Sequence, residues 1–237
     1  MNASTNADKV TVYGFHYSTY VNVARQVLHA KGVPFKFHDT EAEMYTAEHR
    51  KRHPFGRAPV LQHGDFWVYE TGAIVRYVDD AFEGPKLTPT DARKRAKMNQ
   101  WIGNVDSYFY PYMIYYLVHE RLIFPELGIE PDLAVVAHAR PKCEHALAVL
   151  EAELGDARPY IVGEQTTLAD YFVLPSLVAL SLVAEGKEML KRFPMIRSWM
   201  GRMGELPNVK QFRSTLPPRT PIEHARRWAT EHRPRVR

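Results

Sequence analysis

The sequence predicts two domains of different fold class, a small α/β domain with a mixed four-stranded sheet followed by an all-helical domain. Three observations carry this prediction. Up to about residue 84, short runs rich in β-branched and aromatic residues alternate with helical patterns. The segment EGPKLTPTD (83–91) then brings two prolines and one glycine and has no apolar periodicity beyond Leu87, which is typical of a linker. After it, apolar residues recur at helical spacing and no run has strand character.

The first elements of the α/β domain alternate between strand and helix. VTVYG (10–14) reads as a short buried strand that ends at its glycine. In STYVNVARQVLHAKG (18–32) the apolar residues recur at helical spacing, and the final glycine closes the pattern as a C-cap. VPFKFHD (33–39) returns to strand character. The polar segment 40–53 predicts a loop with a short helix.

A hairpin and a helix complete this domain. APVLQHGDFWVYE (58–70) has two apolar runs around His63-Gly64-Asp65, which is a hairpin signal. TGAIVRYVDDAF (71–82) is a helix whose inner side is predicted to hold Ile74, Val75, Tyr77, Val78 and Phe82. The order β-α-β-(α)-β-β-α predicts a right-handed parallel crossover followed by an antiparallel hairpin, and this arrangement is a thioredoxin-like layer.

Prolines punctuate the second domain. They divide it into helical stretches at about 91–122, 132–155, 168–183, 186–191 and 194–204. We expect domain boundaries of 8–84 for the thioredoxin-like domain, 90–215 for the helical domain and 216–237 for a C-terminal tail. Thr167 and Asp170 have the spacing of a capping box at a helix start, which indicates a role in folding.

Composition and charge exclude several classes of protein. The net charge of +4 is mild, and much of the excess lies in the tail from Arg219 onward, so we expect no nucleic-acid partner. The sequence has no apolar run of about 18 residues, which a membrane-spanning helix would need, and its N-terminus lacks a secretory signal. We therefore expect a cytoplasmic protein. The single cysteine, Cys143, excludes an intramolecular disulfide; we interpret it as an ordinary thiol on a helix, with a reactive thiol as the alternative. The histidines lack metal-ligand spacing, so no metal is expected.

The first candidate site feature is Ala58-Pro59, just before the first strand of the hairpin. Proline is tolerated at the first residue of a strand because it has no N–H to donate. An X–Pro bond can also be cis at small cost, and a cis bond here would turn the Ala58 backbone groups outward, toward an extended peptide. From these residues alone, cis and trans stay equally open.

Two further features lie where strands meet helices. Glu70-Thr71 precedes a helix, and a helix N-terminus attracts anions. Glu70 could bind the ammonium of an amino-acid ligand and Thr71 its carboxylate, or Thr71 could simply be the N-cap. Ser18 lies between the first strand and the first helix, where a hydroxyl can lower the pKa of a bound thiol. It could also serve only as the N-cap, a role for which Thr19 competes.

Together these features resemble the glutathione transferase family, over about residues 10–212. HPFGRAPVL (53–61) looks like that family's Asn-Pro-Phe-Gly-x-Val-Pro-x-Leu segment. ETGAI (70–74) resembles its Glu-Ser-x-Ala-Ile segment, and TTLADYFVLPSL (166–177) its Ser/Thr-x-x-Asp signature. PMIRSWMGRMGELPNV (194–209) resembles its closing helix. Four motifs in the right order are fairly specific.

The resemblance implies a role for each candidate residue. Ser18 matches the serine of the phi- and theta-like branch, where it activates the glutathione thiol. Ala58 would pair its backbone with the cysteinyl part of glutathione, with Pro59 in the cis form. The γ-glutamyl end would be bound by the pair at the next strand end, Glu70 and Thr71.

The sequence departs from the family pattern in places. Ala58 replaces the usual Val, and His53 the usual Asn. Met44 and Tyr45 stand where phi-type members have a His-Lys pair, which leaves the glycyl carboxylate without that pair. Arg57 stands where the family often has Lys or Gln, and could reach a carboxylate.

Aromatic residues are candidates for the second-substrate site, which we expect between the domains. Tyr17 and Tyr20 are rivals of Ser18 for the thiolate, Tyr20 being the more typical packing residue and Tyr17 a residue that could line the site. The segment 106–121 is dense in aromatic side chains, some of them helix core. Those expected to be exposed and to bind a flat apolar electrophile are Tyr108, Tyr112, Tyr115 and Tyr116.

The function implied by the resemblance is transfer of the glutathione thiolate to a small apolar electrophile. Glutathione is then a co-substrate, and its sulfur is the nucleophile. The alternatives are a glutathione-dependent isomerase, dehalogenase or peroxidase on the same fold, and a non-catalytic glutathione-fold binding protein. The family also implies a homodimer.

Overall fold

The computed structural model describes residues 10–156, 158–211, 229, 233–234 and 236. The expected N-terminal lead-in and most of the expected tail 216–237 lie outside these residues. The chain divides into two compact units. The first comprises the described residues up to Ala92 together with those of Leu206–Pro217, and the second comprises Arg93–Glu205 and the described residues of Pro218–Arg237.

The first unit is built on a mixed four-stranded sheet, as predicted. Its strands are β1 (Val10–Gly14), β2 (Lys36–Asp39), β3 (Val60–His63) and β4 (Phe66–Tyr69), in the order β2-β1-β3-β4. β1 and β2 are parallel, whereas β3 is antiparallel to both β1 and β4. The hairpin turns at Gly64, whose φ of 64° lies in the left-handed region that glycine adopts without a steric penalty.

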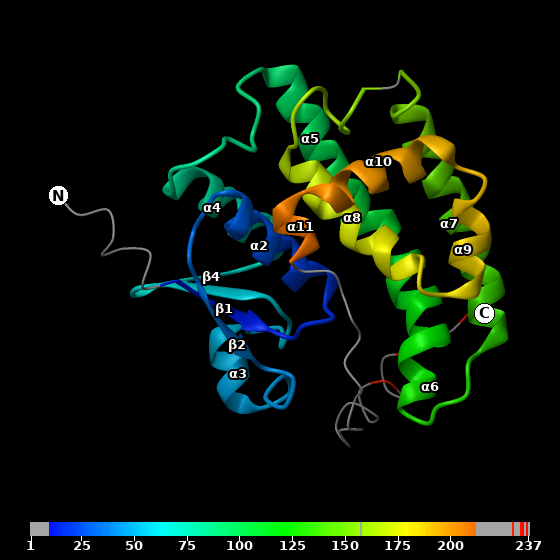
Figure 1. The fold of residues 1–237 in the computed structure, drawn as a ribbon. Helices are drawn as coiled ribbons and strands as arrows, with labels where there is room; N and C mark the ends of the chain where they lie inside the picture. Colours follow the sequence, from blue (N-terminus) through cyan, green and yellow to red (C-terminus); the bar gives the residue numbers. More distant parts are fainter. Residues whose placement is uncertain (1–9, 157, 212–228, 230–232, 235, 237) are drawn as a thin grey trace. The chain divides into compact units, whose positions relative to one another are not determined.

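Three helices flank this sheet. α2 (Thr19–Ala30) and α4 (Thr71–Ala81) lie on one side and α3 (Ala47–Arg52) on the other (Figure 1). α2 packs so closely on β1 that a Cβ added at Gly14 would lie 2.4 Å from Val21 Cγ2. Glycine at the end of β1 therefore allows the helix that follows to sit close against the strand.

The burial of the residues predicted for the inner side of α4 is confirmed only in part. Ile74, Val75 and Val78 are fully buried, as predicted. Tyr77 and Phe82 are only half-buried, because they form a peripheral cluster with His63, whose Nδ1 lies 2.7 Å from the Tyr77 hydroxyl. The periodicity identified the helix, but it could not separate the core from this rim.

The segment expected to be a linker is anchored to the first unit. The buried Asp79 carboxylate of α4 accepts hydrogen bonds from the N–H groups of Leu87 and Thr88, at 3.0 and 2.9 Å. Lys31, also buried, donates to Asp79 and to the Pro85 carbonyl. A buried ion pair therefore organises a stretch whose composition alone suggested a loose connection.

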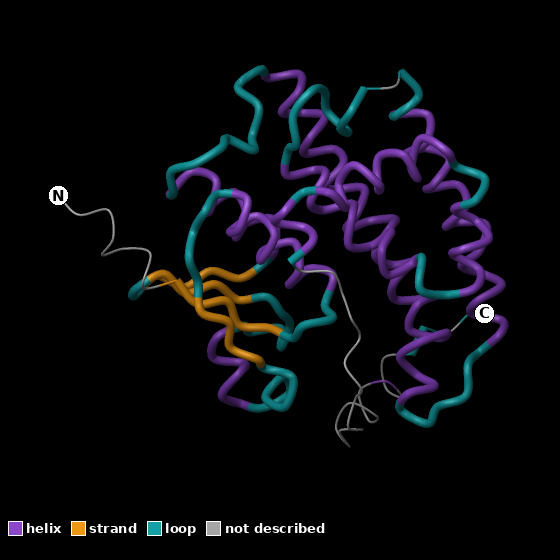
Figure 2. Tube along the Cα trace, in the orientation of Figure 1, coloured by secondary structure: helices purple, strands orange, loops and turns teal. Residues whose placement is uncertain are grey.

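The second unit is helical, and within the described residues it contains no strand (Figure 2). Its longer elements run close to the predicted stretches. They are α5 (Ala92–Asn104), η1 (Val105–Ile123), α7 (Leu133–Glu153), α8 (Leu168–Leu180), α9 (Ala184–Leu190) and α10 (Pro194–Glu205), with a short α6 (Phe124–Glu126) after η1. No helix in the described part of the chain is long and apolar enough to cross a membrane.

The element η1 is a π-helix, which continues α5 with wider turns. At its end the Phe124 N–H donates to the His119 carbonyl, five residues back. Pro111 lies inside it and has no N–H to donate to the preceding turn. Continuous helix was predicted here, but the wider turn was not, because apolar spacing does not separate the two geometries.

The segment from Leu206 lies with the first unit, although we expected a helical domain reaching residue 215. α11 (Pro207–Lys210) packs against α2, and the Asn208 side chain donates to the Gln26 carbonyl at 3.3 Å. The closing helix motif is therefore shared between the units, with α10 in one and α11 in the other.

Two buried polar groups organise the helical unit. The Asp170 carboxylate accepts hydrogen bonds from Ile161 N–H, from Trp199 Nε1 and from both the N–H and the hydroxyl of Thr167, all within 3.1 Å. Burial raises the pKa of Asp170, and these donors oppose that rise. The predicted capping box between Thr167 and Asp170 is present.

The second group is Glu120 of η1, whose side chain is fully buried. Arg233 donates two hydrogen bonds to it, at 2.9 and 2.6 Å, and the Asp132 N–H donates a third, at 2.7 Å. Close by, the buried Ala229 packs on Phe124 and Leu127. The described residues after 218 thus belong to the helical unit. The family resemblance, which covers about residues 10–212, does not include them.

Cys143 lies on α7 and is buried. Burial raises the pKa of its thiol to about 12, so the thiol is protonated at physiological pH. This agrees with the interpretation of an ordinary helix thiol.

Asp170→Ala would leave the four donors around this carboxylate without an acceptor. We expect the free energy of unfolding to fall by about 3 kcal/mol or more. Thr167→Ala should cost about 1 kcal/mol, because it removes only the cap hydroxyl. Urea unfolding followed by circular dichroism measures both. Thr166→Ala is the matched control, since Thr166 makes no contact with this carboxylate; equal losses in all three variants would contradict the assignment.

Candidate functional site

The register of the sheet brings three chain segments to one of its ends. Val60, the first residue of β3, pairs with Tyr13 on one side and Tyr69 on the other. The loop after β1, the turn before β3 and the junction after β4 therefore leave the sheet at the same end. These are the segments that carry Ser18, Ala58-Pro59 and Glu70-Thr71.

Ser18 is the N-cap of α2, which was one of the two roles considered for it. Its Oγ accepts a hydrogen bond from the Val21 N–H at 3.3 Å, and its carbonyl accepts from the Asn22 N–H. Thr19 does not cap the helix but is its first, buried residue. The Ser18 side chain is half-buried, and no described acceptor takes its hydroxyl hydrogen. The cap uses the oxygen of Ser18 as an acceptor and leaves the O–H available to donate.

The rival phenols have other partners. The Tyr17 hydroxyl donates a short hydrogen bond to the Glu41 carboxylate, and its ring lies 4.6 Å from that of Phe15. Tyr20 lies within α2 and is half-buried, as a packing residue would be. Of the hydroxyl groups in this loop, Ser18 therefore has the hydrogen most readily donated to a ligand.

The peptide bond between Ala58 and Pro59 is cis, as the resemblance implied. Pro59 is buried and Ala58 half-buried. Within the described residues, the N–H and the carbonyl of Ala58 have no hydrogen-bond partner. A backbone segment of this kind can pair with an extended peptide in the manner of a strand.

His49, which the sequence pattern did not single out, supports this turn. His49 of α3 is fully buried, and its Nε2 lies 2.8 Å from the Arg57 carbonyl, so Nε2 carries the hydrogen and donates it. His49 thus fixes the backbone directly before Ala58. The sequence shows a histidine in a polar segment with a short helix, but its burial depends on packing that this pattern does not reveal.

His53 is the second buried histidine of this turn. Its ring packs on Tyr69, with ring centroids 4.7 Å apart, and its Nδ1 is buried without a described partner. Burial, and to a lesser degree the charges of His49 and Arg57, lower the pKa of His53 from 6.5 to about 4. The ring is therefore neutral at physiological pH.

Glu70, and not Thr71, is the N-cap of α4, which corrects one of our interpretations. The Glu70 carbonyl accepts from the N–H groups of Ala73 and Ile74, and its side chain makes no capping bond. Its φ of 68° lies in the left-handed region, which costs energy for a residue with a side chain. The exposed Glu70 carboxylate has no partner among the described residues, and the buried Thr71 begins the helix. The Glu70 carboxylate and the N-terminus of α4 thus lie next to each other.

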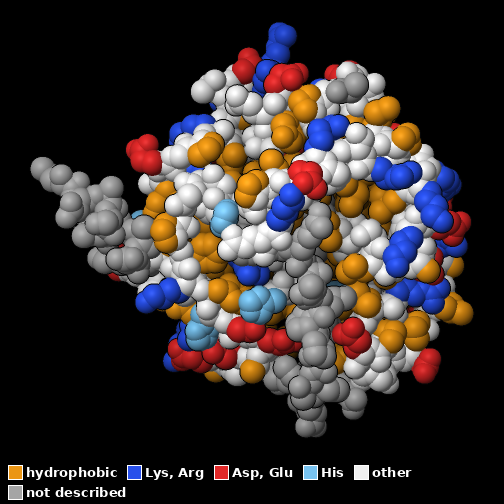
Figure 3. Space-filling view, in the orientation of Figure 1, with side chains coloured by type: hydrophobic (Ala, Val, Ile, Leu, Met, Phe, Trp, Pro, Cys, Tyr) orange, Lys and Arg blue, Asp and Glu red, His pale blue; other side chains and the backbone are white. Residues whose placement is uncertain are grey.

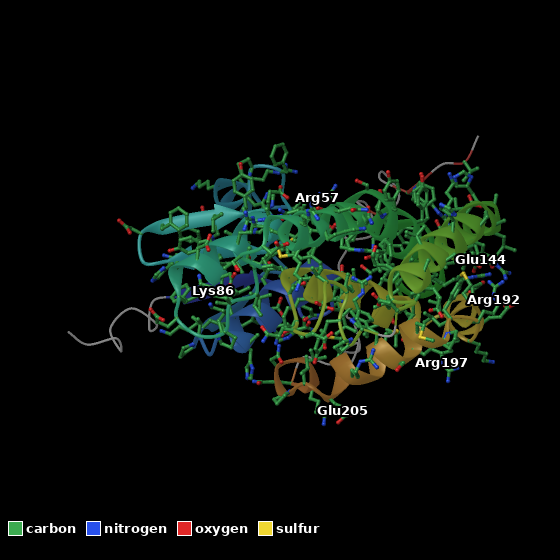
Figure 4. The ribbon with its side chains drawn as sticks, turned by 90° about the horizontal axis from the view of Figure 1, so that it is seen from above. Arg57, Lys86, Glu144, Arg192, Arg197 and Glu205 are labelled. Atoms are coloured by element: carbon green, nitrogen blue, oxygen red, sulfur yellow. The ribbon has the colours of Figure 1, made fainter. Side chains whose placement is uncertain are left out.

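The Arg57 side chain is exposed and has no ion pair with a described residue, so it remains able to bind an anion. Figure 4 labels its position. Met44 is buried with the Thr40 hydroxyl near its sulfur, and its thioether side chain carries no charge.

The tyrosines of η1 are less exposed than expected. Tyr108 is 56% exposed, but Tyr112, Tyr115 and Tyr116 are half-buried. Lys142 of α7 lies 4.7 Å from the centre of the Tyr112 ring, and the Tyr116 ring lies 5.9 Å from that of His138. Part of this aromatic surface is therefore used to pack η1 on α7.

No group of three or more His, Cys, Asp or Glu side chains within the described ranges is arranged to bind a metal ion. The first unit instead presents a hydroxyl donor, two open backbone groups and a helix N-terminus beside a carboxylate. Such a set can bind a zwitterionic peptide and donate a hydrogen bond to its reactive atom.

Comparison with known proteins gives a consistent result. The family model described as "Glutathione S-transferase, N-terminal domain" matches residues 12–86, and "Glutathione S-transferase, C-terminal domain" matches residues 134–202. A "Glutathione S-transferase 1" from Dianthus caryophyllus is 32% identical over 199 residues, which cover 83% of this chain and 87% of the relative.

Solved structures agree in fold and in length. Glutathione S-transferase III in its apo form superposes with a TM-score of 0.78 at 28% identity, covering 90% of this chain and 99% of the other. Glutathione S-transferase I from mais, in complex with an atrazine glutathione conjugate, gives a TM-score of 0.79 at 25% identity, covering 90% of this chain and all of the other.

The low pKa of His53 predicts a pH-dependent stability. The unfolded chain binds a proton at His53 near pH 6.5 and the folded chain only near pH 4, so stability is present above pH 6.5 and is lost as the pH falls toward 4. We expect His53 to contribute roughly 3 kcal/mol to this loss. His53→Gln should flatten the dependence in urea unfolding at graded pH, whereas His145→Gln, on the exposed face of α7, controls for loss of an imidazole. An unchanged slope in His53→Gln would refute the prediction.

Proposed function

The chain belongs to the glutathione S-transferase family and is an enzyme that transfers glutathione, and from this premise we propose that Ser18 activates the glutathione thiol. In this proposal the Ser18 hydroxyl donates a hydrogen bond to the thiolate sulfur. The thiol pKa falls because that bond exists only with the charged form. The sulfur then attacks the electrophile held beside it, and the leaving group departs with its electron pair.

One observation carries this proposal, the hydrogen-bonding state of Ser18. The hydroxyl oxygen accepts from the Val21 N–H, which orients the side chain at the start of α2, and the hydrogen has no described acceptor. The N-terminal end of α2 also carries a partial positive charge, which favours a thiolate close to it. Both effects act in the same direction.

The other contacts with glutathione follow the chemistry of its parts. The N–H and carbonyl of Ala58, which have no hydrogen-bond partner among the described residues, suit the cysteinyl backbone. The Glu70 carboxylate suits the γ-glutamyl ammonium, and the backbone at Thr71 suits its carboxylate. Arg57, exposed and without an ion pair to a described residue, is our candidate for the glycyl carboxylate in place of the missing His-Lys pair.

The second substrate that we propose is a small apolar electrophile with a flat ring. Tyr108 is the most accessible of the η1 tyrosines, and Tyr112, Tyr115 and Tyr116 each keep part of their surface exposed. The related enzyme from mais is recorded with an atrazine glutathione conjugate, which is an aromatic product of this kind. Tyr17, held by Glu41, lines the thiol side of the site in this proposal.

We also propose a cytoplasmic homodimer. Phe55, in the turn between α3 and β3, is 69% exposed, the largest value among the exposed aromatic side chains of the described chain. An apolar side chain so exposed on an ordered turn is typical of an interaction surface.

Ser18→Ala should raise the pKa of the bound glutathione thiol by about 1–2 units, because a hydrogen bond to a charged group is lost. Conjugation at neutral pH should fall by about tenfold or more. Thiolate absorbance against pH and steady-state rates measure the two effects. Ser18→Thr, which keeps both the hydroxyl and the cap, and Tyr17→Phe should remain close to the wild type. An unchanged thiol pKa in Ser18→Ala would exclude the serine mechanism.

His49→Phe keeps the ring volume but leaves the Arg57 carbonyl without its donor. We expect the KM for glutathione to rise about fivefold or more, with a smaller change in kcat, because the backbone that meets the peptide is loosened. His49→Gln retains an N–H donor and should restore part of the affinity. If both variants bound glutathione like the wild type, His49 would have no positioning role.

Phe55→Ser should shift the protein from dimer toward monomer in sedimentation, because it removes an apolar contact from the proposed interface. Trp67→Ser, at another exposed aromatic residue of the same unit, is the control and should leave the mass unchanged. A wild-type protein that is monomeric at all concentrations would disprove the dimer.

A further inference from the structure

The loops that follow β1 and β2 leave the sheet at the same end, because these two strands are parallel. The first loop carries Tyr17 and Ser18, and the second carries Glu41. A hydrogen bond from the Tyr17 hydroxyl to the Glu41 carboxylate joins the two loops. Glu41 thus contacts the residue directly before Ser18, the proposed donor to the thiolate.

The backbone of the second loop holds Glu41 in this place. The Glu41 N–H donates to the Asp39 side chain at 2.9 Å. The next residue back, Thr40, is fully buried, and its N–H donates to the Gly14 carbonyl at the end of β1, also at 2.9 Å. Glu41 itself is half-buried, so water screens its charge less than that of a fully exposed carboxylate.

Glu41 is one of three carboxylates in the segment 39–43, and it differs from the other two in its partner. The other two lie beside basic side chains: Glu43 beside His38 and Arg52, and Asp39 beside His16. Figure 3 shows Asp and Glu side chains gathered with His side chains over α3 and the loop before it. Among the described residues, the only side-chain partner of Glu41 is the neutral phenol of Tyr17. The hydrogen bond holds this carboxylate without neutralising it.

The charge of Glu41 acts on whatever approaches the bound sulfur. In the proposed function the electrophile must reach a thiolate beside Ser18, with Tyr17 lining that side of the site. Charges interact over a Debye length of roughly 8–10 Å at physiological salt, and more strongly where water is partly excluded. An electrophile with its own negative group is therefore repelled here, whereas a neutral or cationic one is not.

We propose that Glu41 selects the second substrate by charge, so that neutral or cationic aromatic electrophiles are favoured over those with a carboxylate or sulfonate. This inference rests on the proposed function, because it takes the thiolate to be bound beside Ser18. It adds the charge class of the electrophile to that function. Glu41 takes no part in the bond changes and acts on specificity alone.

The test compares two electrophiles that react in the same way, the neutral 1-chloro-2,4-dinitrobenzene and the anionic 4-chloro-3,5-dinitrobenzoate. With each of them the sulfur forms a bond to the ring carbon, and chloride leaves with its electron pair. The readout is the ratio of kcat/KM for the anionic electrophile to that for the neutral one, measured on the full-length protein with saturating glutathione. Glu41→Gln removes the charge but keeps an oxygen that accepts from Tyr17. We expect the ratio to rise about fivefold or more, and the difference from the wild type to shrink with added salt.

Glu48→Gln is the matched control, because Glu48 is an exposed carboxylate on α3 that pairs with Lys51. It should keep the wild-type ratio. Glu41→Asp keeps the charge and should keep the ratio low. Equal ratios in Glu41→Gln and Glu48→Gln would overturn the proposal, and so would a ratio in Glu41→Asp as high as that in Glu41→Gln.

A failure of the serine mechanism would show in a different measurement. Loss of thiol activation slows the reaction with both electrophiles alike and leaves their ratio unchanged. The thiol pKa in Ser18→Ala therefore tests the proposed function, and the ratio in Glu41→Gln tests the selection by charge.

Discussion

The hydrogen bond from the buried His49 ring to the Arg57 carbonyl is the constraint on which the candidate site depends. A turn that presents its backbone to a peptide cannot satisfy that backbone internally, so its shape must be held by groups just outside the presented residues. His49 does this from α3, while Val60 begins pairing on the other side of Ala58-Pro59. The two anchors leave Ala58 between them, supported but open.

Ser18, in the neighbouring segment, is likewise held by the protein while part of it stays open. Its oxygen accepts from the Val21 N–H, and its hydrogen has no described acceptor, so in the proposed function one small side chain both begins α2 and donates to the ligand. Gly14 makes this possible, because any side chain there would push α2 away from β1. The same side chain therefore has a structural and a proposed functional role. Ser18→Ala removes both, so its effect must be compared with that of Ser18→Thr, which keeps the hydroxyl and the cap.

The sequence was informative where local pattern decides structure. Strand and helix periodicity located the elements, and the proline and glycine positions marked their ends. Only the family resemblance predicted that Ser18, Ala58 and Glu70 belong to one site, because residues 18, 58 and 70 share no local pattern. The strand register in the structure brings their segments to one end of the sheet. The burial of His49, the use of Asp79 to hold residues 85–88 and the packing of Tyr112 on Lys142 were beyond prediction. Each depends on which side chain reaches a distant element, and periodicity carries no information on that.

The pairing of Arg233 with Glu120 has a consequence for how the helical unit folds. The two residues are 113 positions apart in the sequence. Until Arg233 is in place, the Glu120 carboxylate lacks its cation, and its burial is unfavourable. The packing of η1 therefore depends on a residue distant in sequence, so a substitution at Arg233 acts on the interior of the domain and not merely on its surface.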